Sequence, residues 1–235
     1  SFMIPHGVDV SVFHPEVVSD FRSQHGIPQN AFVVISVGAI AYGHKRMDYV
    51  VKEVSAIKDA YLLIVGQETK DTAEIKALGK RLMGERIIFT KVQHSDLPKA
   101  YAAANVFTLG SVFETFGIVY IEAMAMGLPV ICTNHRNQRA IVKEGIFIDM
   151  RQAGALTKAL RDTDRSTLAA LGQRGRKIVL EHYDLAVLKR KYIERYDTIA
   201  SSPTSLPTYS FANKLACNAR NVVRLAARLT LGRAE

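Results

Sequence analysis

Two glutamates, Glu114 and Glu122, bracket an otherwise apolar run in the segment SVFETFGIVYIEAMAMGLPV. Gly117 lies between them, where a helical pattern begins, so the segment predicts unpaired backbone N–H groups at a helix start. Aligned peptide dipoles place about half a positive charge at such a start, which favours a phosphate group. A carboxylate on either side can accept hydrogen bonds from sugar hydroxyls. The segment predicts a site for a ligand that carries phosphate and carbohydrate.

The predicted phosphate position needs cations, because two carboxylates lie near it. Lys45 and Arg46 supply them from the segment VGAIAYGHKRMD, which follows the first apolar run of the chain. Side chains on a helix tilt toward its N-terminus, so Glu122 reaches back to the mouth of the site and can accept both hydroxyls of a ribose. Glu114 precedes the helix and can bind a sugar beyond the phosphate. We expect the two acids to hold opposite ends of one ligand.

Short apolar runs rich in Val and Ile alternate with helical patterns, which predicts an α/β fold with a doubly wound parallel sheet. The predicted strands are 31–38, 60–66, 86–90, 105–109, 128–133 and 145–149. Helical patterns lie near 47–58, 71–83, 95–104, 117–126 and 152–161, and two further amphipathic segments follow residue 163. The strands lack alternation, so we expect burial on both faces. Ligands of such Rossmann-like sheets bind beyond the carboxyl ends of the strands.

Composition indicates a globular protein: 48% of the 235 residues are hydrophobic and 23% are charged. Two cysteines make a disulfide scaffold improbable and fit a reducing compartment, so we expect a cytoplasmic location. No apolar run reaches the 18 to 20 or so residues that cross a bilayer. The opening SFMIPHGVDVSVF has neither a signal core nor an initiator Met, which suggests a missing N-terminal portion.

Of the net charge of +9, +4 falls in the last 35 residues, so the density of positive charge is highest near the C-terminus. Residues 201–210 have the Ser, Pro and Thr content of a linker, and residues 211–235 form a basic amphipathic pattern. Peripheral contact of residues 211–232 with an anionic membrane surface, on its inner face, is one of three interpretations of this pattern. Packing on another domain and a plain solvated helix remain open. Nucleic acid is not expected as a partner, since few aromatics interleave with the charges.

Several motifs resemble those of retaining glycosyltransferases of the family 4 type (glycosyl transferases group 1), which have the two-domain GT-B fold. These are Glu114 and Glu122 with FG between them, EAMAMGLPVICT after them, and the phosphate-binding loop VGAIAYGHKRMDYVVKEV. IPHGVDVSVFHP resembles the linker into the C-terminal domain of such enzymes. The resemblance covers about residues 3–200. It implies a donor-binding domain over 1–200, with 1–29 as linker and first helix, and an N-terminal domain as its partner.

The resemblance also implies roles for individual residues. Lys45 holds the diphosphate and acts with Glu114 in catalysis, while Glu122 binds the ribose of the donor. The remaining donor-binding positions are Phe116, Gly117, Ile118, Val119, Arg46 and Gly38 for sugar and phosphates, and Gly66, Lys91, Val92 and Leu97 around the base. The implied reaction is hexose transfer from a UDP-sugar, glucose first, to a hydroxyl acceptor in polysaccharide or glycoconjugate synthesis, with retention. Neither a metal nor another cofactor is implied, and the isolated fragment is expected to be inactive without its N-terminal domain.

Two positions depart from the family pattern. Ala39 stands where an arginine commonly pairs with the lysine on the diphosphate, and His6 stands where an asparagine is usual. We hypothesise that Arg46 or His44 replaces the missing cation.

Other interpretations stay open. The two acids could merely complement a helix dipole, Lys45 and Arg46 could form an exposed charged loop, and Gly117 could be only a turn glycine. The chain could also be a nucleotide-sugar epimerase or a phosphorylase on the same fold, or a non-catalytic nucleotide-binding or nucleic-acid-binding module.

Overall fold

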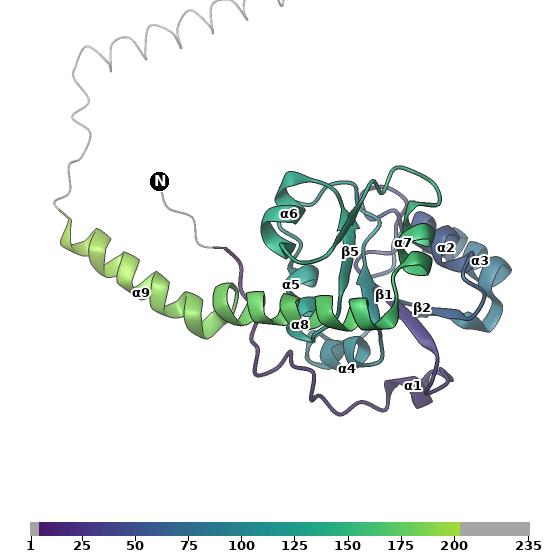
Figure 1. The fold of residues 1–235 in the computed structure, drawn as a ribbon, viewed down its shortest axis with the longest axis horizontal. Coiled ribbons are helices and arrows are strands. Elements are labelled where there is room, and N and C mark those ends of the chain that lie inside the picture. Colours follow the sequence, from purple (N-terminus) through teal and green to yellow (C-terminus); the bar gives the residue numbers. More distant parts are fainter. Residues whose placement is uncertain (1–4, 203–235) are drawn as a thin grey trace, which may run out of the picture. The chain divides into compact units, whose positions relative to one another are not determined.

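A six-stranded parallel sheet forms the centre of the protein (Figure 1). The computed structural model describes residues 5–202. The strands are β1 (Phe32–Val37), β2 (Ala60–Val65), β3 (Ile87–Thr90), β4 (Val106–Thr108), β5 (Val130–Thr133) and β6 (Ile146–Ile148). All six predicted strands are confirmed, with ends that differ by one or two residues. The predicted doubly wound α/β fold is confirmed too.

The strand order is β3-β2-β1-β4-β5-β6, so the direction of progress along the sheet reverses between β1 and β4. Right-handed crossovers on the two sides of this point place helices on opposite faces of the sheet. The loops that leave the carboxyl ends of β1 and β4 then diverge, and the crevice between them is where such sheets bind ligands. The fold therefore points to the loops after Val37 and Thr108.

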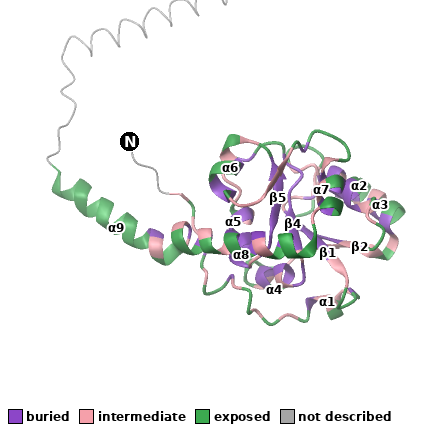
Figure 2. Ribbon diagram, in the orientation of Figure 1, coloured by how far each residue is buried: buried purple, intermediate pink, exposed green. Residues whose placement is uncertain are grey.

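Burial follows the position of each strand in the sheet. Every residue of β4 and β5 is buried, and β1 and β2 each have only one partly buried residue (Figure 2). Continuous Val and Ile runs suit these strands, because helices cover both faces. The edge strands β3 and β6 are partly buried throughout. Burial on both faces is thus confirmed for the four central strands.

The helices that connect the strands match the predicted segments except at one place. They are α1 (Phe21–Gln24), α2 (Met47–Ser55), α3 (Thr72–Met83), α4 (Leu97–Ala102), α5 (Ile118–Ala125), α6 (Arg136–Val142) and α7 (Ala155–Asp162), with short 3₁₀ turns η1 (Gly84–Arg86) and η2 (His94–Asp96). Helix α6 was not predicted from the sequence. It is short and polar in its first turn, so its pattern is weak, and His135 caps it by accepting the Asn137 N–H at 3.3 Å.

Two amphipathic helices, α8 (Arg165–His182) and α9 (Leu185–Ser201), follow the sheet as predicted. Asp164 begins α8 by accepting the Thr167 N–H at 2.8 Å. The compact unit that contains the sheet ends at Ile193. Within the described residues, the helices are all too short or too polar to span a membrane. The predicted tail 211–235, and its membrane-contacting part 211–232, lie outside the described residues, as does all but the start of the predicted linker 201–210.

Candidate functional site

The loops after β1 and β4 leave the same carboxyl edge of the sheet, because these two strands are parallel neighbours, and they approach each other closely at one point before they diverge. Gly110, directly after β4, permits the close approach. A Cβ atom there would lie 2.7 Å from the Arg46 carbonyl oxygen and 3.0 Å from that of Lys45. Sequence reasoning missed Gly110, although a glycine that follows a buried strand is a signal of close backbone approach. The contact brings Lys45 next to the segment that carries Glu114.

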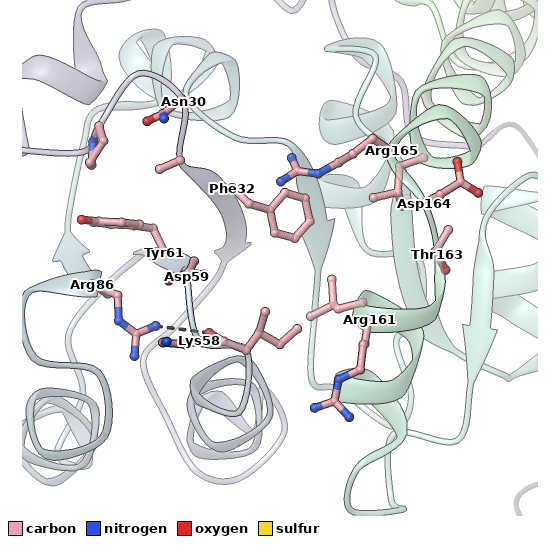
Figure 3. Close-up of a pocket in the computed structure, with 15 residues that line it drawn as sticks. Asn30, Phe32, Lys58, Asp59, Tyr61, Arg86, Arg161, Thr163, Asp164 and Arg165 are labelled. Carbon is pink, nitrogen blue, oxygen red and sulfur yellow. Dashed lines mark hydrogen bonds between the residues drawn. The ribbon is translucent and has the colours of Figure 1, made fainter.

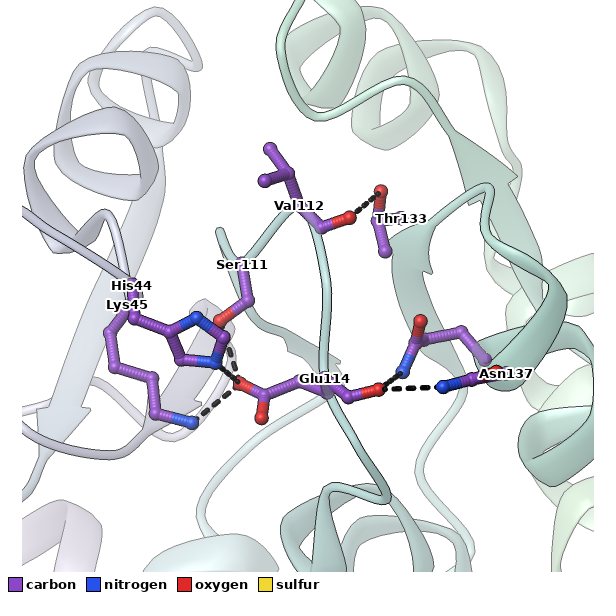
Figure 4. A network of polar contacts seen from close by, with 8 residues as sticks. His44, Lys45, Ser111, Val112, Glu114, Thr133 and Asn137 are labelled. Carbon is purple, nitrogen blue, oxygen red and sulfur yellow. Dashed lines mark hydrogen bonds and ion pairs between the residues drawn. The ribbon is translucent and has the colours of Figure 1, made fainter. Parts of the chain in front are cut away.

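The carboxylate of Glu114 is the centre of a polar cluster (Figure 4). Its Oε1 atom lies 2.5 Å from Lys45 Nζ, 2.8 Å from Ser111 Oγ and 3.1 Å from His44 Nε2. Glu114 is only 7% exposed. Its Oε2 atom accepts no hydrogen bond from the residues that the structure describes. One carboxylate oxygen is therefore fixed by the protein, and the other is left for a ligand.

Two opposing effects set the charge of Glu114. Burial by itself would raise the pKa of this carboxyl group. Hydrogen bonds from Lys45, Ser111 and His44 outweigh burial, and the pKa lies below its ordinary value. The group is therefore an ionised hydrogen-bond acceptor at neutral pH.

The main chain of the same segment is held by α6 and by the end of β5. The Glu114 carbonyl oxygen accepts hydrogen bonds from Gln138 Nε2 at 2.9 Å and from Asn137 Nδ2 at 3.4 Å. Thr133 Oγ1 donates to the Val112 carbonyl at 3.3 Å. The sequence did not indicate these residues, because α6 itself was not predicted.

Helix α5 begins at Gly117, as predicted. Gly117 has φ +78°, and a Cβ atom there would lie 2.6 Å from the ring of Tyr120, so both backbone and space require glycine. No side chain caps the helix, and its first turn has no acid. Within residues 5–202, the N–H groups of residues 116–119 donate to no acceptor. The start of α5 thus offers unpaired donors, and neither Glu114 nor Glu122 occupies them.

Glu122 lies on α5 and belongs to a different cluster. Its Oε1 atom lies 3.1 Å from His94 Nε2, and its Oε2 atom accepts a hydrogen bond from the Tyr101 hydroxyl at 3.0 Å. Burial raises the pKa of Tyr101 well above its ordinary value, and the charge of Glu122 adds to the effect. The His94 side chain is 72% exposed, whereas that of Glu122 is 5% exposed. In the described part of the chain, no contact joins this cluster to Glu114.

The structure separates the two residues proposed to replace a cation at Ala39. Arg46 donates to the Met150 carbonyl, and its guanidinium lies 4.6 Å from the centroid of the Tyr49 ring. His44 contacts Glu114 instead. Of the two, His44 is therefore the residue that lies at the Glu114 cluster.

The ends of β1, β2 and β3 surround a cavity of about 480 Å³, which includes two of the predicted base-binding positions, Gly66 and Lys91. Gly66 also packs on the loop after β1, since a Cβ there would lie 1.7 Å from the Gly38 carbonyl oxygen. The other two positions, Val92 and Leu97, follow β3 and are partly buried and buried respectively.

A second cavity, of about 760 Å³, lies at the opposite, amino edge of the sheet, near Phe32 and Tyr61 (Figure 3). Arg165 stands 4.0 Å from the Phe32 ring centroid at this cavity. None of the predicted site residues lines it. Among residues 5–202, no group of three or more His, Cys, Asp or Glu side chains is placed to hold a metal ion.

The geometry agrees with what sequence comparison finds. The profile of the family described as Glycosyl transferases group 1 matches residues 31–164. The chain belongs to this family. A curated relative, the UDP-Gal:alpha-D-GlcNAc-diphosphoundecaprenol alpha-1,3-galactosyltransferase of Escherichia coli, is 26% identical over 196 residues. That match covers 78% of this chain and 50% of the relative, so the chain spans half of the relative's length.

Solved structures show the same fold. The sucrose-phosphate synthase of Thermosynechococcus elongatus superposes with a TM-score of 0.76 at 29% identity, over 85% of this chain and 53% of that protein. The C-terminal domain of a group 1 glycosyltransferase (LpcC) from Francisella tularensis superposes with a TM-score of 0.65 at 22% identity. There the match covers 76% of this chain and the whole of the solved domain. The fold of this chain is thus the Rossmann-like half of a GT-B fold.

Proposed function

We propose that this chain binds the nucleotide sugar donor of a retaining hexosyltransferase, with UDP-glucose as the first candidate. The observation that carries the proposal is the Lys45–Glu114 pair, which lies at the reversal point of a doubly wound sheet. Glu114 also begins the segment that leads into the unpaired N–H groups at the start of α5. The family and the UDP-sugar named for the E. coli relative support the choice of ligand.

The donor diphosphate would bind to the two positive groups of the site. Lys45 supplies a full charge, and the N–H groups of residues 116–119 supply a partial charge with free donors. In the free protein, Glu114 already neutralises part of the Lys45 charge. The partly buried ammonium group is therefore not left without a counter-ion. The Oε2 atom of Glu114 would accept a hydrogen bond from a hydroxyl group of the donor hexose.

The catalytic contribution of this chain would be electrostatic. In the transfer, the bond between the anomeric carbon and the diphosphate oxygen breaks, and the acceptor oxygen bonds to the same face of the sugar. The acceptor proton passes to the departing diphosphate, so charge balances. Lys45 and the start of α5 would stabilise the negative charge that develops on the leaving group, while Glu114 favours the positive charge on the sugar ring. Metal independence remains a prediction of this proposal.

The nucleoside would extend along the carboxyl edge of the sheet. Glu122 would bind the ribose beside the exposed His94, and the cavity at Gly66 and Lys91 would take the base. Because the chain spans half the length of the E. coli relative, we expect the 235 residues alone to bind the nucleotide but to transfer sugar slowly or not at all. The predicted location of the enzyme remains cytoplasmic, with peripheral contact to the inner face of a membrane as the alternative.

Titration calorimetry with UDP tests the proposal. The wild-type chain should bind UDP, and Lys45→Ala should weaken binding by about 10- to 100-fold, because a charge-assisted contact contributes about 1.5–3 kcal/mol. Glu122→Ala should weaken it as well. Lys177→Ala is the matched control, since Lys177 is an exposed lysine on α8, 4.0 Å from Glu181. Wild-type protein that fails to bind UDP, or equal binding by Lys45→Ala and Lys177→Ala, would contradict the proposal.

A further inference from the structure

Gln138 is a fully buried polar residue whose side-chain amide makes a single hydrogen bond within the described residues. Its Nε2 atom donates to the Glu114 carbonyl at 2.9 Å, but its Oε1 atom has no partner among the described residues. An unpaired buried acceptor destabilises a fold, and an apolar side chain of similar size would avoid the penalty. What Gln138 contributes is therefore the bond to Glu114.

Glu114 is held at both ends. Figure 4 shows its carboxylate directed to His44 and Lys45 and its carbonyl directed to Asn137, which comes from the opposite side. Asn137 donates to the same carbonyl oxygen as Gln138, at the longer distance of 3.4 Å. Two side-chain amides on one carbonyl oxygen fix the orientation of the peptide that contains it.

That orientation matters because of peptide geometry. The described chain has no cis peptide bond, and in a trans peptide the N–H points opposite to the C=O. Since the Glu114 carbonyl points toward α6, the Thr115 N–H points away from α6. The N–H groups of residues 115–119, which lead directly into α5, find no acceptor in the described part of the chain, and neither do those of residues 111–114. The Glu114–Thr115 peptide thus sets the direction of the Thr115 N–H, the donor that links the Glu114 side chain to the start of α5.

We propose that Gln138, assisted by Asn137, is a positioning residue of the donor site. It holds the Glu114–Thr115 peptide so that the N–H row of residues 115–119 faces the donor diphosphate, and it does not itself touch the donor. This inference rests on the proposed function. It adds α6, which contacts Glu114 through its main-chain carbonyl, to the elements that determine nucleotide affinity.

The test compares Gln138→Met with the wild-type chain. Methionine fills a similar volume but donates no hydrogen bond, so UDP affinity measured by calorimetry should fall about tenfold, the effect of one hydrogen bond. The melting temperature should change little, because the unpaired Oε1 atom is removed as well. At saturating UDP, amide hydrogen exchange in residues 115–119 should be faster in Gln138→Met than in the wild type, and exchange elsewhere should be unchanged. Arg139→Met on the same helix is the control, since Arg139 contacts Asn134 and Phe147, and its UDP affinity should equal that of the wild type.

The outcomes separate this inference from the proposed function. Wild-type protein that binds no UDP contradicts the proposed function and removes the role of Gln138 with it. Wild-type binding with equal affinity in Gln138→Met overturns the positioning role alone, as does a loss of affinity that accompanies faster exchange throughout the sheet. If Gln138→Met does not fold, Asn137→Ala keeps the shorter bond and should weaken UDP binding about two- to threefold, with faster exchange in residues 115–119 at saturating UDP. Unchanged affinity would overturn the inference.

Discussion

Lys45 Nζ lies 2.5 Å from Glu114 Oε1, although 69 positions separate the two residues in the chain. The pair joins the loop after β1 to the loop after β4, across the point where the strand order reverses. The side chains are 24% and 10% exposed, so solvent screens the interaction less than at an open surface. The contact is therefore a property of the assembled sheet edge and of no single segment.

Acid should remove the stabilising contribution of Glu114. Its pKa in the folded protein lies below the ordinary 4.5, so the unfolded chain binds the proton more readily than the folded protein does. The contribution is complete above about pH 4.5 and disappears as the pH falls through the folded pKa. Urea unfolding of wild type and Glu114→Gln should differ by about 1–3 kcal/mol at pH 7, with a smaller difference at pH 3. A difference that stays constant between these pH values would contradict this.

Gly117→Ala should destabilise the protein more than a glycine replacement at another left-handed position. Gly117 has φ +78°, and an added Cβ would lie 2.6 Å from the buried Tyr120 ring. Gly26 has φ +66° with nothing within 4 Å of an added Cβ. Gly26→Ala should cost about 1–2 kcal/mol from backbone strain alone, and Gly117→Ala about 2–4 kcal/mol from strain plus displacement of the ring. Urea unfolding measures both, and equal losses would show that Tyr120 adapts without cost.

Removal of the Tyr101 hydroxyl should show how much stability is lost when Glu122 Oε2 has no donor. The hydroxyl donates to Glu122 Oε2 at 3.0 Å in a fully buried position. Tyr101→Phe should lower the free energy of unfolding by about 1.5–3 kcal/mol, as expected for a hydrogen bond to a charged group. Tyr61→Phe is the control, because the Tyr61 hydroxyl makes no hydrogen bond within the described residues, and its effect should stay within about 0.5 kcal/mol. Thermal or urea unfolding measures both free energies of unfolding. Similar losses in the two variants would refute a stabilising role of the Tyr101–Glu122 hydrogen bond.

His44 should contribute more to nucleotide binding than Arg46 does. His44 lies 3.1 Å from Glu114 Oε1, whereas Arg46 is engaged by the Met150 carbonyl and the Tyr49 ring. Calorimetry should show that His44→Ala lowers the affinity for UDP by about threefold or more. Arg46→Ala should lower the affinity less, in protein that remains folded. The reverse order would indicate that Arg46 leaves Met150 when the nucleotide binds.

The helix that holds Glu114 from behind was the main gap in sequence reasoning. Strands and long helices were predicted because Val and Ile runs and helical periodicity are local signals. The predicted ends of the strands agree with the observed ends within one or two residues. Helix α6 has seven residues, and its pattern is too short to distinguish from a loop. The need for a crossover between the parallel neighbours β5 and β6 was the signal that pointed to it.

The sequence by itself determined the alternation of strands and helices, the helix start at Gly117, and which side chains carry the needed charge. It could do so because periodicity, glycine and charge act over a few neighbouring residues. Only the tertiary structure decided that Glu114 pairs with Lys45 and His44, that Glu122 pairs with His94 and Tyr101, and that Arg46 turns to Met150. These choices depend on which loops the strand order brings together, and on competition among donors tens of positions apart, which no local pattern encodes.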